Sequence, residues 1–484
     1  MGDNGNTRRE FLRALGIGAA TLAAGPSDAG AGPLHGRPAG RALPNFVFIL
    51  ADDLGYQDLG CYGSTRNRTP CIDRLAAEGV RFTSFYATSG VCTPSRASLM
   101  TGCYPRRVSM HTDEAGEWVL FPVSRKGLNP TEVTVSKLLK TSGYSTYCVG
   151  KWHLGDQLAF LPRRHGFDHY FGIPYSNDMG AEQRRGNPPL PLLVDDEVIG
   201  APVDQDTLTE RYTREAVRIV AESKNRPFFL LLSHFVPHTP LHSGASFRGK
   251  SANGQYGDAV EELDASTGEM LAALERHGLD ENTLVVFASD NGGVRRENNG
   301  PLTGTKGSTM EGGMRVPFIA RRPGFVPAGT TCGELASMMD ILPTFAALAG
   351  IHAPGGRVID GRNIVSLLQE PHRARTPYDA FYYYFMGQLQ AVRAGKWKLH
   401  LPLTKKRHGW HQPTYEERGQ LYDLDTDESE RHDLFDTHPD VVSRLTALAE
   451  AARRDIGNED RDGRNQRAAG WVERAEPLTL ARSR

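Results

Sequence analysis

The sequence is poor in several features that mark whole classes of protein. Its 484 residues include only six cysteines, and none of them form a C-x-x-C pair, which argues against a zinc site. Lys plus Arg number 56 and Asp plus Glu number 57, so the formal net charge is only -1. This balance gives no global attraction to nucleic acid or to an anionic membrane. Any preference for an anionic ligand must therefore come from a local site.

The N-terminal 31 residues have the pattern of an export signal. Arg8 and Arg9 precede a short apolar run over 14–24 and a small-residue stretch, Ala29–Ala31, of the Ala-x-Ala type. No other stretch approaches the roughly 18 apolar residues of a membrane-spanning helix. A chance arginine pair on an amphipathic helix is the alternative interpretation. We expect a twin-arginine signal over 1–31, a linker over 32–44, and a periplasmic or extracellular protein that uses the twin-arginine export machinery.

Four short apolar runs, each bounded by polar residues or glycine, predict the buried strands of a mostly parallel sheet. These runs are Phe46–Leu50, Tyr144–Val149, Phe228–Leu232 and Leu284–Ala288. Between them lie segments with helical patterns: Thr69–Glu78, Val133–Thr141, Leu208–Lys224 and Tyr256–His277. Alternation of strands and helices predicts an α/β sandwich, with a large central sheet flanked by helices.

The character of the sequence changes near residue 371. Aromatic and apolar runs broken by Gly387 and Gly395 predict antiparallel hairpins, and a helix is predicted over Val441–Arg454. We therefore expect a catalytic domain over 45–370 and a smaller α+β subdomain over 371–458. The arginine-rich remainder, 459–484, is predicted to be a flexible tail.

Acidic residues follow two of the predicted strands. Asp52 and Asp53 follow the first, and Asp290 and Asn291 follow the fourth, at the sheet edge where ligands of α/β proteins gather. Three carboxylates this close would repel one another, and a cation relieves that repulsion. Oxygen ligands favour calcium or magnesium over zinc. A single Asp in such a place is more often a helix cap, so the predicted metal site depends on both pairs together.

A cysteine is predicted at the start of a helix. Cys92 or Thr93 can cap this helix, Pro94 suits its first turn, and Gly102 ends it. The positive end of the helix dipole would stabilise an anionic centre at residue 92, and Arg96 lies one turn on along the same face. Taken alone, such a cysteine is equally well explained by packing in the core.

The segment Cys92–Gly102, with its Cys-x-Pro-x-Arg core, resembles the signature of the sulfatase family, in which this cysteine is converted to Cα-formylglycine. Further blocks that resemble the family occur in order over 50–55, 150–155, 237–240, 289–293 and 304–317. Segment 172–178 resembles the branch of arylsulfatase A and N-acetylgalactosamine-6-sulfatase. The resemblance covers about 45–368 and implies an alkaline-phosphatase-like fold.

The resemblance also implies an activity, which is hydrolysis of sulfate monoesters, either aryl sulfates or sulfated sugars. A formylglycine hydrate at residue 92 would attack sulfur, form a covalent sulfo-enzyme and release inorganic sulfate. The implied metal ligands for Ca²⁺, with Mg²⁺ possible, are Asp52, Asp53, Cys92, Asp290 and Asn291. The implied roles elsewhere are sulfate binding for Lys151 and Lys306, orientation of the diol for Arg96 and proton removal for His153. His238 is implied to be either an acid or a sulfate-binding group near the leaving oxygen, and Asp178 is expected to line the substrate pocket.

Besides the sulfated substrate, the resemblance implies a formylglycine-generating enzyme as a partner. Because twin-arginine cargo folds before export, we expect Cys92 to be oxidised in the cytoplasm while its segment is still unfolded.

Two other functions compete with sulfate hydrolysis. A phosphoesterase or phosphonate monoester hydrolase of the same superfamily usually recruits two metals, but only one cluster of hard ligands is evident in the sequence. A non-catalytic binder of sulfated glycans would lack the nucleophile or its activators, yet all of these are present. The sequence alone does not identify the natural substrate.

Overall fold

The computed structural model describes residues 43–352, 355–407 and 414–480. The predicted signal peptide, and all of the predicted linker before residue 43, lie outside these ranges. Among the helices in the described ranges, none is both long enough and apolar enough to cross a membrane.

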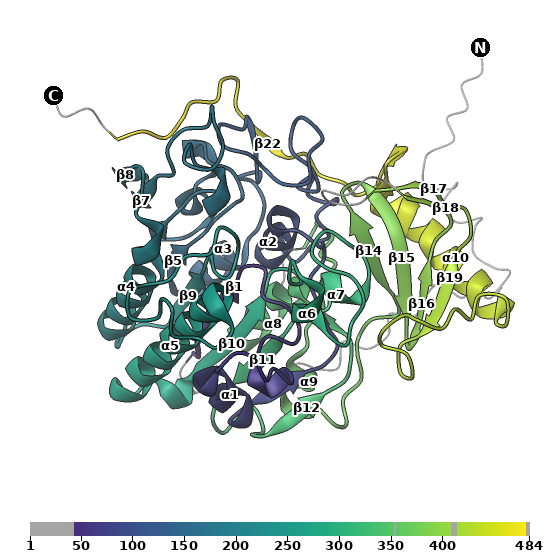
Figure 1. The fold of residues 1–484 in the computed structure, drawn as a ribbon, viewed down its shortest axis with the longest axis horizontal. Helices are drawn as coiled ribbons and strands as arrows, with labels where there is room; N and C mark the ends of the chain where they lie inside the picture. Colours follow the sequence, from purple (N-terminus) through teal and green to yellow (C-terminus); the bar gives the residue numbers. More distant parts are fainter. Residues whose placement is uncertain (1–42, 353–354, 408–413, 481–484) are drawn as a thin grey trace, which may run out of the picture. The chain divides into compact units, whose positions relative to one another are not determined.

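A ten-stranded sheet forms the centre of the molecule (Figure 1). In spatial order its strands are β12 (Thr330–Cys332), β2 (Val80–Phe82), β11 (Phe318–Arg321), β10 (Thr283–Ser289), β1 (Asn45–Ala51), β9 (Phe228–Ser233), β5 (Ser145–Gly150), β6 (His169–Gly172), β7 (Leu192–Val194) and β8 (Glu197–Gly200). The five inner strands, from β10 to β6, are parallel. On one side β11 and then β2 add antiparallel pairs and β12 pairs parallel with β2, and on the other side β7 and β8 add antiparallel pairs. The four predicted strands are confirmed as β1, β5, β9 and β10.

Helices cover both faces of this sheet because successive side chains of a strand point to opposite faces. From β1, Val47 and Ile49 pack with α1 (Pro70–Ala77), α4 (Leu208–Glu222) and α5 (Gly254–Arg276). Phe46 and Phe48 pack on the other face, which is covered by α2 (Cys92–Thr101), α3 (Val135–Lys140), α8 (Ile341–Leu348) and α9 (Val365–Gln369). The predicted sandwich and its helices are confirmed.

A second, antiparallel sheet follows in the chain (Figure 1). It contains β14 (Phe381–Phe385), β15 (Gln388–Ala394), β16 (Trp397–His400) and β19 (Gln420–Asp423), and α10 (Pro439–Asp455) packs against it. Short two-stranded pairs complete the fold: β3 (Phe85–Tyr86) with β13 (Ala336–Ser337), β17 (Leu403–Lys406) with β18 (Thr414–Glu416), and β20 (Gly457–Asn458) with β21 (Arg461–Asp462). The smaller sheet with its helix agrees with the sequence prediction.

The segment after α10 differs from the flexible tail expected from its composition. Within its described part, β22 (Gly470–Trp471) pairs with β4 (Lys126–Gly127), far back in the catalytic domain. Arg467 donates from Nε to Oε1 of the buried Glu132 at 2.8 Å. An arginine-rich composition predicts a solvated segment, but here one of the arginines satisfies a buried carboxylate.

Candidate active site

The predicted acidic residues meet at the carboxyl ends of β1 and β10. These strands are adjacent and parallel, and Ala51 pairs with Ser289 at their ends. The residues that follow therefore come together: Asp53 donates from its backbone N to Oδ1 of Asp290 at 3.2 Å, and Asn291 donates from Nδ2 to Oδ1 of Asp53 at 2.8 Å. Both pairs are buried, so the predicted convergence of oxygen ligands is present in the structure.

Cys92 enters this group from the first turn of α2. The residue that caps the helix is Val91, with no side-chain cap, so the expected cap by Cys92 or Thr93 is wrong. Cys92 is itself the first helical residue, and its Sγ donates to Oδ1 of Asp52 at 3.3 Å. Potential ligand atoms of Asp52, Asp53, Cys92 and His238 all lie within 4.8 Å of one another.

Each of the three carboxylates is paired with a basic side chain. Arg96 donates from Nε to Oδ2 of Asp290 at 2.9 Å, and Lys151 donates from Nζ to Oδ2 of Asp52 at 2.5 Å. Nζ of Lys306 lies 2.8 Å from Oδ2 of Asp53. We call these six residues the site cluster: Asp52, Asp53, Asp290, Arg96, Lys151 and Lys306. All six are buried, so their mutual attraction is only weakly screened by water.

The two histidines present different nitrogen atoms to the site. Nε2 of His153 lies 2.9 Å from the carbonyl oxygen of Leu120, which only accepts, so Nε2 carries the proton. Nδ1 of His153 is buried and has no hydrogen-bond partner among the described residues. His238 uses Nδ1 for the carbonyl of Thr239, at 2.5 Å, and its Nε2 lies 3.6 Å from Oδ2 of Asp53.

Burial and neighbouring charges change the protonation of the site. Burial, then the charges of Lys151 and Arg96, lower the pKa of His153 well below its ordinary value, so His153 is a neutral base. Burial and the charge of Asp52 raise the pKa of the Cys92 thiol well above its ordinary value. The unmodified thiol therefore stays protonated and is a poor nucleophile.

A hard cation fits the donors that converge here. Oδ1 of Asn291 is buried without a hydrogen-bond partner among the described residues, although its Nδ2 donates to Asp53 and to the carbonyl of Gly292. Burial and the charge of Asp52 raise the pKa of Asp290 to about 6, which indicates crowded negative charge. An unpaired oxygen among carboxylates is a suitable ligand for calcium or magnesium.

The structure divides the predicted metal ligands in an unexpected way. Asp52, Asp53 and Cys92 lie in the compact group, but Asp290 does not, because its carboxylate is turned toward Arg96. His238, predicted to be an acid or a sulfate-binding group, does belong to the group. Asp53 also has φ 64°, a left-handed conformation that costs energy in a non-glycine residue and is common at functional sites.

A cavity of about 300 Å³ opens onto these groups. Its polar lining residues are Asp53, Cys92, His153, Ser176, Asp178, Arg184, His238, Thr239 and Lys306, and its apolar ones are Trp118, Val119, Phe121, Met179 and Val294. The predicted position of Asp178 in the lining agrees with the structure, where its Oδ2 is paired with Arg184 at 2.8 Å.

Several residues of the site were missed from the sequence. Ser233 accepts from Arg96 at 2.7 Å, and Ser176 accepts from Lys151 at 3.1 Å. Ser233 is the last residue of β9, so its place at the active edge of the sheet could have been predicted. The loop 118–121 carries no comparable signal, because only the fold brings it to the cavity.

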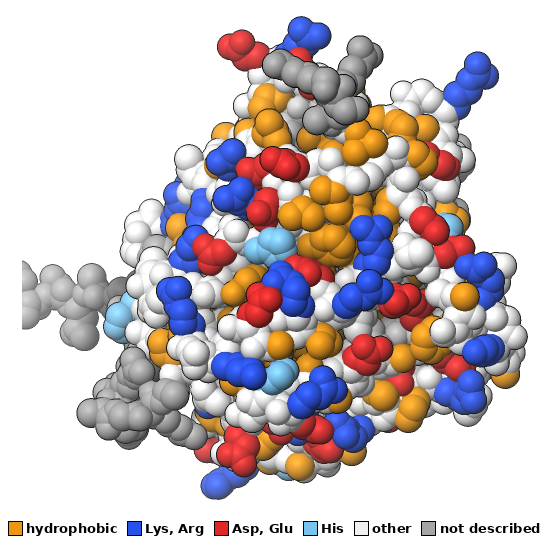
Figure 2. All heavy atoms as spheres, turned by 90° about the vertical axis from the view of Figure 1, so that its left-hand side faces the viewer, with side chains coloured by type: hydrophobic (Ala, Val, Ile, Leu, Met, Phe, Trp, Pro, Cys, Tyr) orange, Lys and Arg blue, Asp and Glu red, His pale blue; other side chains and the backbone are white. Residues whose placement is uncertain are grey.

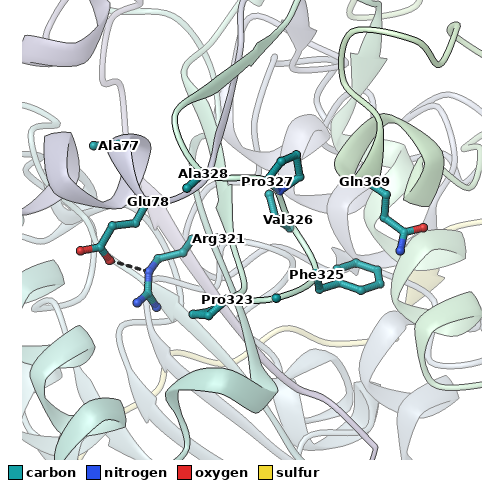
Figure 3. Close-up of a pocket in the computed structure, with 10 residues that line it drawn as sticks. Ala77, Glu78, Arg321, Pro323, Phe325, Val326, Pro327, Ala328 and Gln369 are labelled. Carbon is teal, nitrogen blue, oxygen red and sulfur yellow. Dashed lines mark hydrogen bonds and ion pairs between the residues drawn. The ribbon is translucent and has the colours of Figure 1, made fainter.

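A larger hollow, of about 650 Å³, lies elsewhere, beside the end of β11 (Figure 3). Its wall includes Pro323, Phe325, Val326 and Pro327, and its charged groups, Glu78 and Arg321, are paired with each other at 2.7 Å. Its lining contains no cysteine and no histidine. The smaller cavity therefore holds the reactive groups.

Comparison with known proteins identifies the relatives of this chain. A family model described as Sulfatase matches residues 44–351, and one described as the C-terminal region of aryl-sulfatase matches residues 376–476. Arylsulfatase A of Homo sapiens is 39% identical over 446 residues, covering 84% of this chain and 87% of that protein. N-acetylgalactosamine-6-sulfatase of Rattus norvegicus is 38% identical over 377 residues, covering 74% of this chain and 71% of that protein.

Solved structures give the same result for the fold. The PsFucS1 sulfatase from Pseudoalteromonas sp. has a TM-score of 0.76 and 27% sequence identity, covering 85% of this chain and 90% of that one. The alkaline-phosphatase-like fold and the resemblance inferred from the sequence motifs are confirmed.

Proposed function

The chain belongs to the sulfatase family and is a sulfuric ester hydrolase, and on this premise we propose that its nucleophile is a formylglycine hydrate formed from Cys92. One observation carries the proposal: Cys92 lies within 4.8 Å of the ligand atoms of Asp52, Asp53 and His238. A nucleophile beside a set of cation ligands and a neutral histidine is suited to ester hydrolysis.

Two properties of Cys92 support its modification before folding. Its thiol is protonated and therefore a poor nucleophile, whereas an aldehyde hydrate offers two hydroxyl groups. All ten residues of α2 are buried, so a formylglycine-generating enzyme has no access to residue 92 in the folded protein. Oxidation in the cytoplasm, before twin-arginine export to the periplasm or beyond, is consistent with this burial.

In the first step, one hydroxyl of residue 92 attacks sulfur and the bond from sulfur to the alcohol oxygen breaks. The hydroxyl proton is lost, the leaving alcohol gains one, and the sulfate remains on residue 92 as an ester. Nδ1 of His238 is hydrogen-bonded to the carbonyl of Thr239. If His238 donates the proton to the leaving alcohol, the donating atom is therefore Nε2.

In the second step, Nδ1 of His153 takes the proton of the remaining hydroxyl. The C=O bond of the aldehyde forms again, the bond from carbon to the sulfate oxygen breaks, and inorganic sulfate leaves. Addition of water then restores the hydrate. Nδ1 of His153 is suited to this task because it is buried, has no partner among the described residues, and belongs to a neutral ring.

The charges of the site cluster suit a divalent cation together with sulfate. Its three carboxylates balance its three basic side chains, so a divalent cation would leave two positive charges for the ligand. A sulfate monoester offsets one of them, and the inorganic sulfate product offsets both. Asp52, Asp53, Asp290 and Asn291 would hold calcium, with residue 92 beside them. When bound, calcium would withdraw charge from a sulfate oxygen and from the attacking hydroxyl. Lys151 and Lys306 would then bind the other sulfate oxygens, and Arg96 would orient the diol.

The cavity favours a small leaving group. A volume of about 300 Å³ accommodates a sulfate and roughly one ring, which fits an aryl sulfate or a terminal sulfated sugar. Acidic and basic side chains are interspersed over the face shown in Figure 2, without a large area of one sign. Attraction of the sulfate at the site would depend on Lys306, which lines the cavity, and on Lys151, which is buried beside Asp52.

Two measurements test this function. Mass analysis of the peptide that contains Cys92, from protein made in its native host, should find the aldehyde. Turnover of an aryl sulfate should greatly exceed turnover of the matching aryl phosphate. A protein that contains only the thiol, or that prefers the phosphate, would contradict the proposal.

A further inference from the structure

Lys306 lies on a loop between α6 (Arg296–Asn299) and α7 (Glu311–Met314). The catalytic domain holds the middle of this loop through two backbone hydrogen bonds. Lys306 donates from its backbone N to the carbonyl of Gly293 at 3.0 Å, and Gly307 donates to the carbonyl of Gly90 at 2.7 Å. These bonds place the loop beside the metal-ligand turn and the start of α2.

The C-terminal subdomain holds both ends of the same loop. At one end, Thr303 donates from Oγ1 to the carbonyl of Ser429 at 2.6 Å. At the other end, Thr309 donates from Oγ1 to Oε1 of Gln390 at 2.7 Å, and its carbonyl accepts from Nζ of Lys398 at 2.9 Å. The position of the loop thus depends on three bonds to residues outside the catalytic domain.

Lys398 is the centre of a buried network at this contact. Its ammonium group lies 2.9 Å from Oε1 of Glu311 and 2.8 Å from Oε1 of Glu430, and it lies 4.1 Å from the centre of the Tyr383 ring. Glu430 accepts at Oε2 from the backbone N of Glu311 at 2.7 Å. The side chains of Lys398, Glu311 and Glu430 are 0% exposed.

A buried ion pair of this kind is an inefficient way to gain stability, because apolar residues of similar volume often stabilise a protein as well or better. A buried ammonium does supply directional bonds that an apolar side chain cannot make. Here one of these bonds ends on the carbonyl of Thr309, three residues after Lys306. This geometry gives Lys398 a role in positioning the loop.

We propose that Lys398 is a positioning residue through which the C-terminal sheet sets the location of the Lys306 ammonium group in the active site. The inference rests on the proposed role of Lys306 in binding sulfate. Lys398 does not line the active-site cavity. Its effect on turnover is therefore transmitted by the loop 303–311.

The test is a double-mutant cycle on kcat/KM for an aryl sulfate with the full-length, modified enzyme. Lys398→Met keeps most of the side-chain volume but removes the charge and the bond to Thr309. We expect it to lower kcat/KM about 10- to 100-fold, the size of effect that a small displacement of a catalytic group produces. In a background of Lys306→Ala, the same change should lower kcat/KM by less than about twofold, because the group that it positions is gone.

The matched control is Leu399→Ala. Leu399 is the next residue of β16, points to the opposite face of the sheet and is buried in the core with α10. We expect this variant to lose stability. Its kcat/KM, measured below its melting temperature, should stay within about threefold of the value for the parent enzyme. If Lys398→Met does not fold, Gln390→Leu removes the other side-chain bond to Thr309 and enters the same cycle.

The outcomes separate the inference from the proposed function. Equal losses from Lys398→Met with and without Lys306 would show a general structural effect and overturn the inference alone. Equal losses from Lys398→Met and Leu399→Ala would do the same. If Lys306→Ala leaves kcat/KM of the parent enzyme unchanged, the proposed role of Lys306 fails first, and the inference fails with it.

Discussion

The molecule contains two buried groups of charged residues that differ in what surrounds them. Asp53 and Lys306 of the site cluster line the cavity, and the cluster adjoins an acceptor, Oδ1 of Asn291, that has no hydrogen-bond partner among the described residues. The second group lies between the catalytic domain and the C-terminal sheet. We call it the support cluster, and it comprises Glu311, Glu430, Lys398, His400 and Arg393.

In the support cluster, every carboxylate oxygen accepts at least one hydrogen bond. Glu311 accepts from Lys398 and Tyr383 at Oε1 and from Tyr86 at Oε2. Glu430 accepts from His400 at Oε1 and from the backbone of Glu311 at Oε2. The carboxylate oxygens of the site cluster accept hydrogen bonds as well, so the two groups differ in their surroundings. The support cluster is enclosed and joins two chain segments, whereas the site cluster borders a cavity that can admit a ligand.

The comparison is tested most strongly at residue 92. We expect Cys92→Ala to lower kcat for an aryl sulfate by about 10³-fold or more, because the nucleophile is lost. The melting temperature should change little, since residue 92 serves the reaction and not the fold. Steady-state kinetics and calorimetry measure the two effects. A stable variant that keeps its turnover would refute the nucleophile.

A change at His153 should have the next largest effect. His153 has φ 62°, and Asn tolerates this conformation better than most residues, so His153→Asn removes the base with little backbone strain. We expect kcat to fall about 10²- to 10⁴-fold, with the sulfate ester on residue 92 accumulating because the second step is slow. Intact-protein mass measurement during turnover detects the ester. Absence of the ester in a slow variant would place His153 in the first step.

Removal of the metal should affect both activity and stability. We expect a chelator to lower kcat/KM about 10²-fold and added calcium to restore it, because the carboxylates of the site cluster would no longer have the cation. The melting temperature should also fall, since a ligand that binds only the folded state stabilises it by about 2.7 kcal/mol at a concentration of 100 Kd. A chelator without effect on either quantity would contradict the metal site.

The support cluster should show the reverse pattern, with a large effect on stability and the smallest effect on turnover. Glu430→Gln leaves His400 without its charged partner and leaves Lys398 with Glu311 alone, and we expect it to cost about 3 kcal/mol in the free energy of unfolding. The fall in kcat, measured well below the melting temperature, should be less than about tenfold. Glu417→Gln, at an exposed acid in the same subdomain, is the control and should be neutral. An unchanged unfolding curve for Glu430→Gln would contradict the comparison.

Most of the catalytic domain could be predicted from the sequence because its signals are local. Apolar runs identify buried strands, and polar residues after Leu50 and Ala288 identify the edge where chemistry occurs. The order of motifs then places Cys92 and its partners. These signals depend only on residues close together in the chain, so they can be recognised without knowledge of the fold.

The remaining features depend on contacts between distant segments. No sequence pattern links Lys398 and Glu430 to Lys306. Only the folded structure shows that both residues contact the loop 303–311 that carries Lys306. The capping residue of α2 was missed because Val91 caps through its backbone alone. The arginine-rich tail was misjudged because composition does not reveal that Arg467 reaches Glu132.

The pairing of β22 with β4 has a consequence for biosynthesis. Trp471 is paired in register with Lys126, so this strand joins a part of the domain that began hundreds of residues earlier. A ribosome must release the chain through Trp471 before this contact can form. During that interval the nascent domain lacks this strand, and the proposed oxidation of Cys92 would fall within the same interval.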